Sequence, residues 1–183
     1  SAKPVVLVGT GIETDRLFTS VMTDHGKLGK SLADAVIQGK AVKVGILSGN
    51  QSQLGMRQRL KSVKDKLEEA GIEISWILSE KELDKKMRNV EYFAEQPVDT
   101  VISLDNDDTE KAVDIILNDD RISWKLYGEG RSEKLIYYLD KGTIQELAVP
   151  NEYYMGYQSI ALAAQNIRYY TDKTEQAEVE FYM

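Results

Sequence analysis

The chain has 183 residues, of which 42% are hydrophobic and 29% are charged, and its formal net charge is −7. This is the composition of a globular protein, and the negative charge argues against a nucleic-acid-binding surface, which would carry a basic stripe. The absence of cysteine excludes disulfide bonds and thiolate zinc sites. The chain also has only one histidine, which leaves few side chains for metal binding or covalent catalysis. We therefore expect no catalytic residues, no metal site, no cofactor and no enzymatic activity.

Short apolar runs rich in β-branched residues alternate with helical patterns along the chain. The predicted strands cover residues 5–8, 20–23, 42–47, 72–77, 100–104, 124–127, 144–149 and 179–182. Several of these runs are continuously apolar, as in strands that are buried on both faces of a parallel sheet. Regular alternation of strand and helix predicts parallel strands joined by right-handed crossovers, and therefore an α/β fold with a doubly wound sheet.

The predicted helices show apolar residues at spacings of three and four. Met56, Leu60, Val63 and Leu67 form one apolar stripe, and Gly71 is placed to end that helix. Residues 42–142 hold four consecutive strand–helix units, which would suffice for a lobe of their own. The flanking segments on either side supply only a strand or two and a helix each.

Polar residues follow the predicted strands at their carboxyl ends, where open α/β sheets bind ligands. We expect Asp107 or Asp108 to cap the helix after strand 100–104, which leaves Asp105 and Asn106 able to hydrogen-bond the hydroxyl groups of a sugar. Arg57 begins the helix after a small polar loop and is predicted to face the ligand. Arg59, two residues later, is predicted to be solvated.

Two glycine-containing loops remain open to interpretation. Glu129 lies between Gly128 and Gly130, which allow a sharp turn that presents the acid at a strand end, although a solvated loop acid fits equally well. The segment 9–14 begins like a dinucleotide fingerprint. It lacks the third glycine and no helical pattern follows, so a loop at a strand end is favoured over nucleotide binding.

Taken in order, these motifs resemble the second half to two-thirds of a type 1 periplasmic binding protein. This is the ribose- and galactose-binding family, which shares its lobes with lac-repressor-like effector domains. The segments that carry the resemblance are Pro4-Val5-Val6-Leu7-Val8-Gly9, Asp24-His25-Gly26 where the family has Asp-Asn, Gly45–Gly49 before Arg57-Gln58-Arg59, Pro97-Val98-Asp99, Asp105-Asn106, Gly128-Glu129-Gly130, Gly142-Thr143-Ile144 and Met155-Gly156-Tyr157.

The resemblance implies a Rossmann-like lobe plus an incomplete second lobe, with ligand held between hinged lobes. It assigns the chain as follows: 1–40 to a remnant of the first lobe, 41–142 to the second lobe, 143–170 to a strand and helix returning to the first lobe, and 171–183 to a last crossing and strand of the second. It places ligand contacts at Arg57, at Asp105 or Asn106, and at Glu129, with a hinge contact at Asn151. Where the family often has an acid after its first strand here, this chain has Thr10, which joins the candidates.

The function implied by the resemblance is capture of a small polar ligand, a carbohydrate, for ABC-type uptake with a membrane permease as partner. The location would then be extracytoplasmic, in the periplasm or as a cell-surface lipoprotein. One alternative is the cytoplasmic effector domain of a lac-repressor-like regulator, and another is a nucleotide-using α/β enzyme. Because half of the first lobe precedes residue 1 in the family, we expect strand 5–8 to present an open edge and this chain to self-associate.

Overall fold

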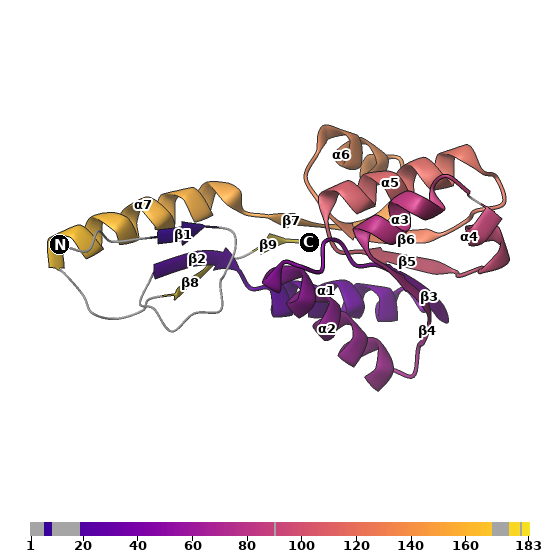
Figure 1. The fold of residues 1–183 in the computed structure, drawn as a ribbon, viewed down its shortest axis with the longest axis horizontal. Helices are drawn as coiled ribbons and strands as arrows, with labels where there is room; N and C mark the ends of the chain where they lie inside the picture. The colour runs from indigo at the N-terminus through magenta and orange to yellow at the C-terminus, as the bar shows by residue number, and fades with distance from the viewer. Residues whose placement is uncertain (1–5, 9–18, 90, 170–175, 180) are drawn as a thin grey trace. The chain divides into compact units, whose positions relative to one another are not determined.

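The computed structural model of the protein (Figure 1) describes residues 6–8, 19–89, 91–169, 176–179 and 181–183. The chain divides into two compact units. The first combines residues 1–24 with residues 150–182, and the second contains residues 25–149 and Met183.

The second unit is built on a parallel sheet, as the sequence predicted. The strands are β3 (Lys43–Leu47), β4 (Glu73–Leu78), β5 (Thr100–Ser103), β6 (Lys125–Glu129) and β7 (Ile144–Pro150), whereas the short strand β9 (Phe181–Tyr182) falls in the first unit. The five strands lie in the order β4-β3-β5-β6-β7, and each pairing is parallel. The chain therefore runs outward from β3 to β4, returns to β5 on the other side of β3, and continues outward to β7. The predicted α/β fold is confirmed.

Helices cover both faces of this sheet (Figure 1). They are α1 (His25–Gln38), α2 (Leu54–Glu69), α3 (Glu80–Lys86), α4 (Glu91–Glu95), α5 (Asn106–Asn118) and α6 (Glu133–Asp140). Figure 1 shows α1 and α2 on one side and α3, α5 and α6 on the other. After α2 and after α6, Gly71 and Gly142 adopt φ angles of +69° and +78°, which glycine tolerates without a steric cost. The predicted helix stop at Gly71 is confirmed, and Gly142 ends α6 in the same way.

The core beneath α3 to α6 is one cluster of apolar side chains with an aromatic centre. The Phe93 ring lies 5.9 Å from that of Trp76 and 5.3 Å from that of Trp124, both in edge-to-face geometry or close to it. Such pairs stabilise a core beyond the area that they bury. Across the sheet, Leu28 and Leu32 of α1 are fully buried.

The first unit contains a smaller parallel sheet and one long helix. The strands β1 (Val6–Val8), β2 (Thr19–Thr23) and β8 (Gln176–Val179) pair in the order β1-β2-β8. The helix α7 (Glu152–Tyr169) packs beside β1 and β2. Within the described residues β1 pairs with β2 alone, so one edge of β1 carries no strand there. Self-association of the chain stays a prediction.

The boundaries between the units differ from those expected. They fall after Asp24 and after Val149, whereas the sequence placed them after residues 40 and 142. The helix α1 joins the second unit because its apolar stripe is buried there and packs closely on α2. The strand β7 does so because it pairs with β6, matching Leu126 with Ile144.

Candidate ligand-binding site

A cavity of about 330 Å³ opens at the carboxyl ends of β3, β5 and β6. This is the point where the chain reverses its direction across the sheet, because β3 leads to β4 on one side while β5 and β6 lie on the other. Ligands of open α/β sheets bind at such switch points. The residues that line the cavity are Asn50, Gln53, Met56, Arg59, Glu80, Asp105, Asn106, Asp107, Asp108 and Glu129.

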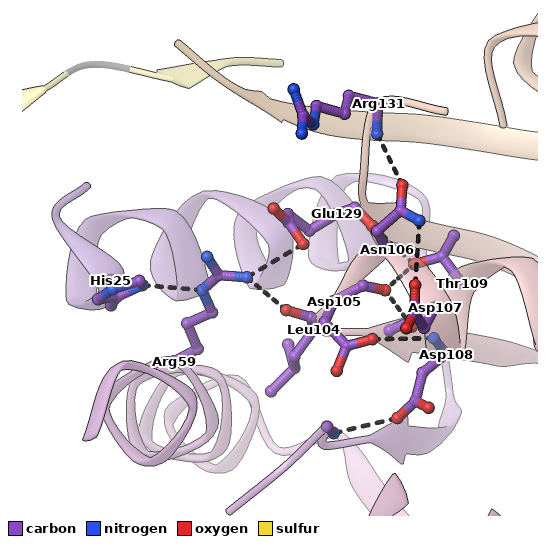
Figure 2. Close-up of polar contacts among 12 residues, drawn as sticks. His25, Arg59, Leu104, Asp105, Asn106, Asp107, Asp108, Thr109, Glu129 and Arg131 are labelled. Carbon is purple, nitrogen blue, oxygen red and sulfur yellow. Dashed lines mark hydrogen bonds and ion pairs between the residues drawn. The ribbon is translucent and has the colours of Figure 1, made fainter. Parts of the chain in front are cut away.

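Among the described residues of this lining, Arg59 alone is basic, and it is buried. Its Nη1 lies 3.2 Å from Oε2 of Glu129 and donates to the carbonyl oxygen of Leu104, while Nε donates to Nδ1 of His25 at 3.0 Å (Figure 2). The expectation that Arg59 is solvated is therefore wrong. A buried guanidinium needs such partners because an unpaired charge away from water is strongly destabilising.

Glu129 is the last residue of β6 and not a loop residue, because the strand continues two residues beyond its predicted end. Its side chain is 10% exposed and forms the ion pair with Arg59. Of the two interpretations left open by the sequence, a buried acid at a strand end is the one observed, and a solvated acid is not.

Asp105 is itself the N-cap of α5, since its Oδ1 accepts the N–H of Asp108 at 2.8 Å. The prediction that Asp107 or Asp108 would be the cap is therefore wrong. Asp105 still lines the cavity, because capping uses only one carboxylate oxygen. Burial raises the pKa of the Asp105 carboxyl, and the negative charges of Asp107 and Glu80 act in the same direction.

Asp108 points to the loop after β3. Its Oδ2 accepts the N–H of Gly49 at 3.2 Å, and its Oδ1 lies 3.4 Å from Nζ of Lys111. Burial, followed by the charge of Asp105, raises the pKa of Asp108 to about 6. A side chain on Gly49 would not fit, because its Cβ would lie 2.3 Å from Oδ2 of Asp105. The two acids therefore hold this loop against the start of α5.

Asn106 connects α5 with the segment before α6. Its Oδ1 accepts the N–H of Arg131 at 3.1 Å (Figure 2). The same oxygen accepts the N–H of Ser132 at 3.3 Å, and Nδ2 donates to Glu110 at 3.2 Å. Nearby, the buried hydroxyl of Thr109 lies 2.6 Å from the Asp105 carbonyl oxygen and 2.8 Å from that of Glu129. These contacts fix the relative positions of Asp105, Asn106 and Glu129 around the cavity.

The remaining predicted residues lie elsewhere. Arg57 is exposed, and its Nη1 donates to the carbonyl oxygens of Gln51 at 3.2 Å and Ser52 at 3.0 Å; it does not line the cavity. Asn151 belongs to the first unit and donates from Nδ2 to the Tyr182 hydroxyl at 3.0 Å. Thr10 lies outside the described residues. Their roles in binding stay predictions.

The sequence interpretation missed Arg59, His25 and Glu80. A signal for Arg59 exists, since it lies three residues after Met56 and four before Val63 and so falls on the buried stripe of α2. Nothing in the sequence pairs His25 with Arg59, which lies 34 residues further along.

Comparison with known proteins decides the family. The model of the periplasmic binding protein domain matches residues 2–170. The chain belongs to this family. The match confirms the resemblance to type 1 periplasmic binding proteins that the sequence motifs indicated. A comparison with curated protein sequences found no match.

Solved structures of the family share this fold at low sequence identity. GanP, a glucose-galactose binding protein from Geobacillus stearothermophilus, is 22% identical with a TM-score of 0.84, over 98% of this chain and 66% of its own. A carbohydrate transporter solute binding protein from Agrobacterium radiobacter, in complex with D-arabinose, is 17% identical with a TM-score of 0.81, over 98% and 65%. A LacI transcriptional regulator from Bacillus cereus is 17% identical with a TM-score of 0.77, over 97% and 65%. The chain thus spans about two thirds of each.

Two searches of the described part of the chain gave negative results. None of its helices combines the length and the hydropathy that crossing a membrane requires. No group of three or more histidine, cysteine, aspartate or glutamate side chains there is arranged to hold a metal ion.

Proposed function

We propose that this chain binds a small sugar as part of a solute-binding protein for ABC-type uptake. The observation that carries the proposal is the cavity at the switch point of the sheet, where carboxylates and amides surround a buried guanidinium. Its volume of about 330 Å³ lies in the range of small-molecule sites, roughly 300–1,000 Å³. Several structures with the same fold are those of sugar-binding and transport proteins, which supports the same ligand class.

The polar groups of the cavity suit a ligand with many hydroxyl groups. Five of the lining residues carry carboxylates, which accept hydrogen bonds, and three carry amides, which both donate and accept. A sugar hydroxyl can donate to a carboxylate and accept from the guanidinium of Arg59. We therefore infer that Arg59, Asp105 and Glu129 contact the ligand, with Asn106 holding the loop beside them.

The first test is a thermal-shift screen of monosaccharides on the full-length protein. A ligand at 100 times its dissociation constant should stabilise the protein by about 2.7 kcal/mol. A screen in which no sugar raises the melting temperature would contradict the proposal.

Variants at Asp105 and Arg59 test the site itself. Asp105→Asn keeps an N-cap acceptor but removes the charge, and Arg59→Lys keeps a cation but removes the planar fork. Each should weaken binding of the sugar found in the screen by roughly 1–3 kcal/mol in titration calorimetry, since each leaves polar partners unpaired. Lys61→Ala is the matched control, because Lys61 is exposed on the same helix and does not line the cavity. If all three variants bound the sugar with equal affinity, this cavity would not be its binding site.

A second candidate function is effector binding by a lac-repressor-like regulator, because the LacI structure shares this fold. The sequence upstream distinguishes the two, since a regulator carries a helix-turn-helix segment and an uptake protein carries a secretory or lipoprotein signal. We propose binding without catalysis in either case. Melting curves with added nucleotides test the enzyme alternative, which a nucleotide-dependent shift would favour.

A further inference from the structure

His25 lies where the chain enters the second unit, and it reaches the cavity through Arg59. It is the first residue of α1 and the first residue of that unit, and it is the only histidine in the chain. Its side chain is buried, although it does not line the cavity itself. His25 therefore connects the start of the unit with Arg59, whose side chain lines the cavity.

The hydrogen bond between the two side chains defines the state of the imidazole. Nε of Arg59 is a donor only, so Nδ1 of His25, 3.0 Å away, must be the acceptor. An acceptor nitrogen carries no proton, and this requires a neutral ring with its hydrogen on Nε2. The imidazole thus fixes Nε of Arg59 while Glu129 and the Leu104 carbonyl oxygen hold Nη1 (Figure 2).

The third guanidinium nitrogen, Nη2 of Arg59, remains available to a ligand. Among the described residues, the hydrogen bonds and the ion pair of Arg59 involve Nε and Nη1 only, and no buried side-chain polar atom there lacks a partner, so Nη2 must retain contact with solvent. Arg59 lines the cavity, so Nη2 is the guanidinium nitrogen left over for a ligand bound there. The direction of Nη2 is determined by the groups that hold Nε and Nη1, and His25 is one of them.

Close packing between α1 and α2 prevents the imidazole from moving away. A Cβ on Gly55 of α2 would lie 2.4 Å from Nε2 of His25, so the backbone of α2 passes directly against the ring. A Cβ on Gly29 of α1 would lie 2.6 Å from the carbonyl oxygen of Arg59. Each helix thus has a glycine at the place where it contacts the other member of the pair.

We propose that His25 is a positioning residue for ligand binding, which orients Arg59 and links the ligand cavity to the point where the chain passes from one unit to the other. This inference rests on the proposed function. An asparagine oxygen at this position could accept the same hydrogen bond. The required property is then an acceptor at this position and not the imidazole ring as such.

The test compares His25→Asn, which keeps an acceptor near the position of Nδ1, with His25→Leu, which fills similar space without one. Titration of the full-length variants with the sugar that the wild-type protein binds should show about a tenfold loss for His25→Leu and a loss within about threefold for His25→Asn. Melting temperatures of the two variants serve as the control for folding. Equal losses in both variants, with the wild-type protein binding its sugar, would overturn the role of His25 and leave the proposed function intact.

A second measurement does not depend on any ligand. Long-range ¹H–¹⁵N NMR spectra report which imidazole nitrogen bears the proton, and the signal of His25 is the one absent from His25→Asn. We expect a proton on Nε2 and an Nδ1 signal that shifts in Arg59→Lys. A proton on Nδ1, or no response to Arg59→Lys, would overturn the inference even if sugar binding is found. Absence of sugar binding in the wild-type protein would instead refute the proposed function, and the role of His25 with it.

Discussion

Asp108 is a buried carboxylate whose ionisation opposes folding. Its pKa is raised to about 6 in the folded protein, from an ordinary value of 3.8, chiefly because of burial. An acid with a higher pKa in the folded state binds protons more tightly when folded, so its contribution to stability is most favourable below pH 4. That contribution falls as the pH rises to about 6 and stays low above it.

The variant Asp108→Asn should remove this part of the pH dependence. Asparagine can still accept the N–H of Gly49 without a charge to bury, so the variant should match or exceed the wild-type stability at pH 7.5, by up to about 3 kcal/mol. Near pH 4 the advantage should vanish. Urea unfolding at both pH values measures the difference. Asp107→Asn is the control, because it removes the same charge from the neighbouring residue, which is exposed. An identical pH dependence in wild type and Asp108→Asn would contradict the assignment.

At the scale of single residues, the sequence predicted which acids gather at the site better than it predicted their roles. Asp105, Asn106 and Glu129 do line one cavity, because the carboxyl ends of adjacent parallel strands meet at one edge of a sheet. The identity of the cap was missed because four consecutive polar residues can each serve, and the choice depends on where β5 ends. Helical phase separates Arg59 from Arg57, because Arg59 falls on the buried stripe of α2 with Met56 and Val63 and Arg57 does not.

The contact between α1 and α2 is an element-scale feature that depends on small residues. A Cβ at Gly29 would meet the backbone carbonyl oxygen of Arg59 at 2.6 Å, and a backbone atom cannot move aside as a flexible side chain can. We expect Gly29→Ala to reduce the free energy of unfolding by about 1–3 kcal/mol, as overpacking does in general.

The matched control for this prediction is Gly156→Ala in α7, where no described residue lies within 4 Å of the added Cβ. There the higher helix propensity of alanine should leave stability unchanged or raise it by up to about 1 kcal/mol. Denaturant unfolding of both variants provides the comparison. If Gly29→Ala proved as benign as Gly156→Ala, the close approach of the two helices would be disproved.

Most elements could be predicted from the sequence because local signals mark them clearly. The buried strands β3 and β5 are β-branched runs, and Gly71 and Gly142 end the helices before β4 and β7. The partner of a helix is harder to predict, since an apolar stripe shows that a face is buried but not against which element. The stripe of α1 therefore gave no indication that it packs on α2.

At the scale of the whole molecule, the two units differ in how they are connected along the chain. Residues 25–149 of the second unit form one uninterrupted segment, whereas the first unit combines segments separated by that whole length. The resemblance to the family placed the first boundary after residue 40. Burial of Leu28, Leu32 and Val36 in the second unit explains why the boundary lies before α1 instead.

We therefore predict that a polypeptide of residues 25–149 folds cooperatively by itself. It contains the five strands β3 to β7 in register, the helices on both faces and the aromatic cluster around Phe93, so it should bury a continuous core. A polypeptide of residues 41–149, which starts at the boundary that the sequence indicated, lacks α1 and exposes the surface that α1 covers.

Urea unfolding followed by circular dichroism should show a single steep transition for the longer polypeptide, and a weakened or absent transition for the shorter one. Equal stability of the two would show that α1 does not belong to the core of this unit, and a gradual transition in both would show that the unit needs the rest of the chain to fold.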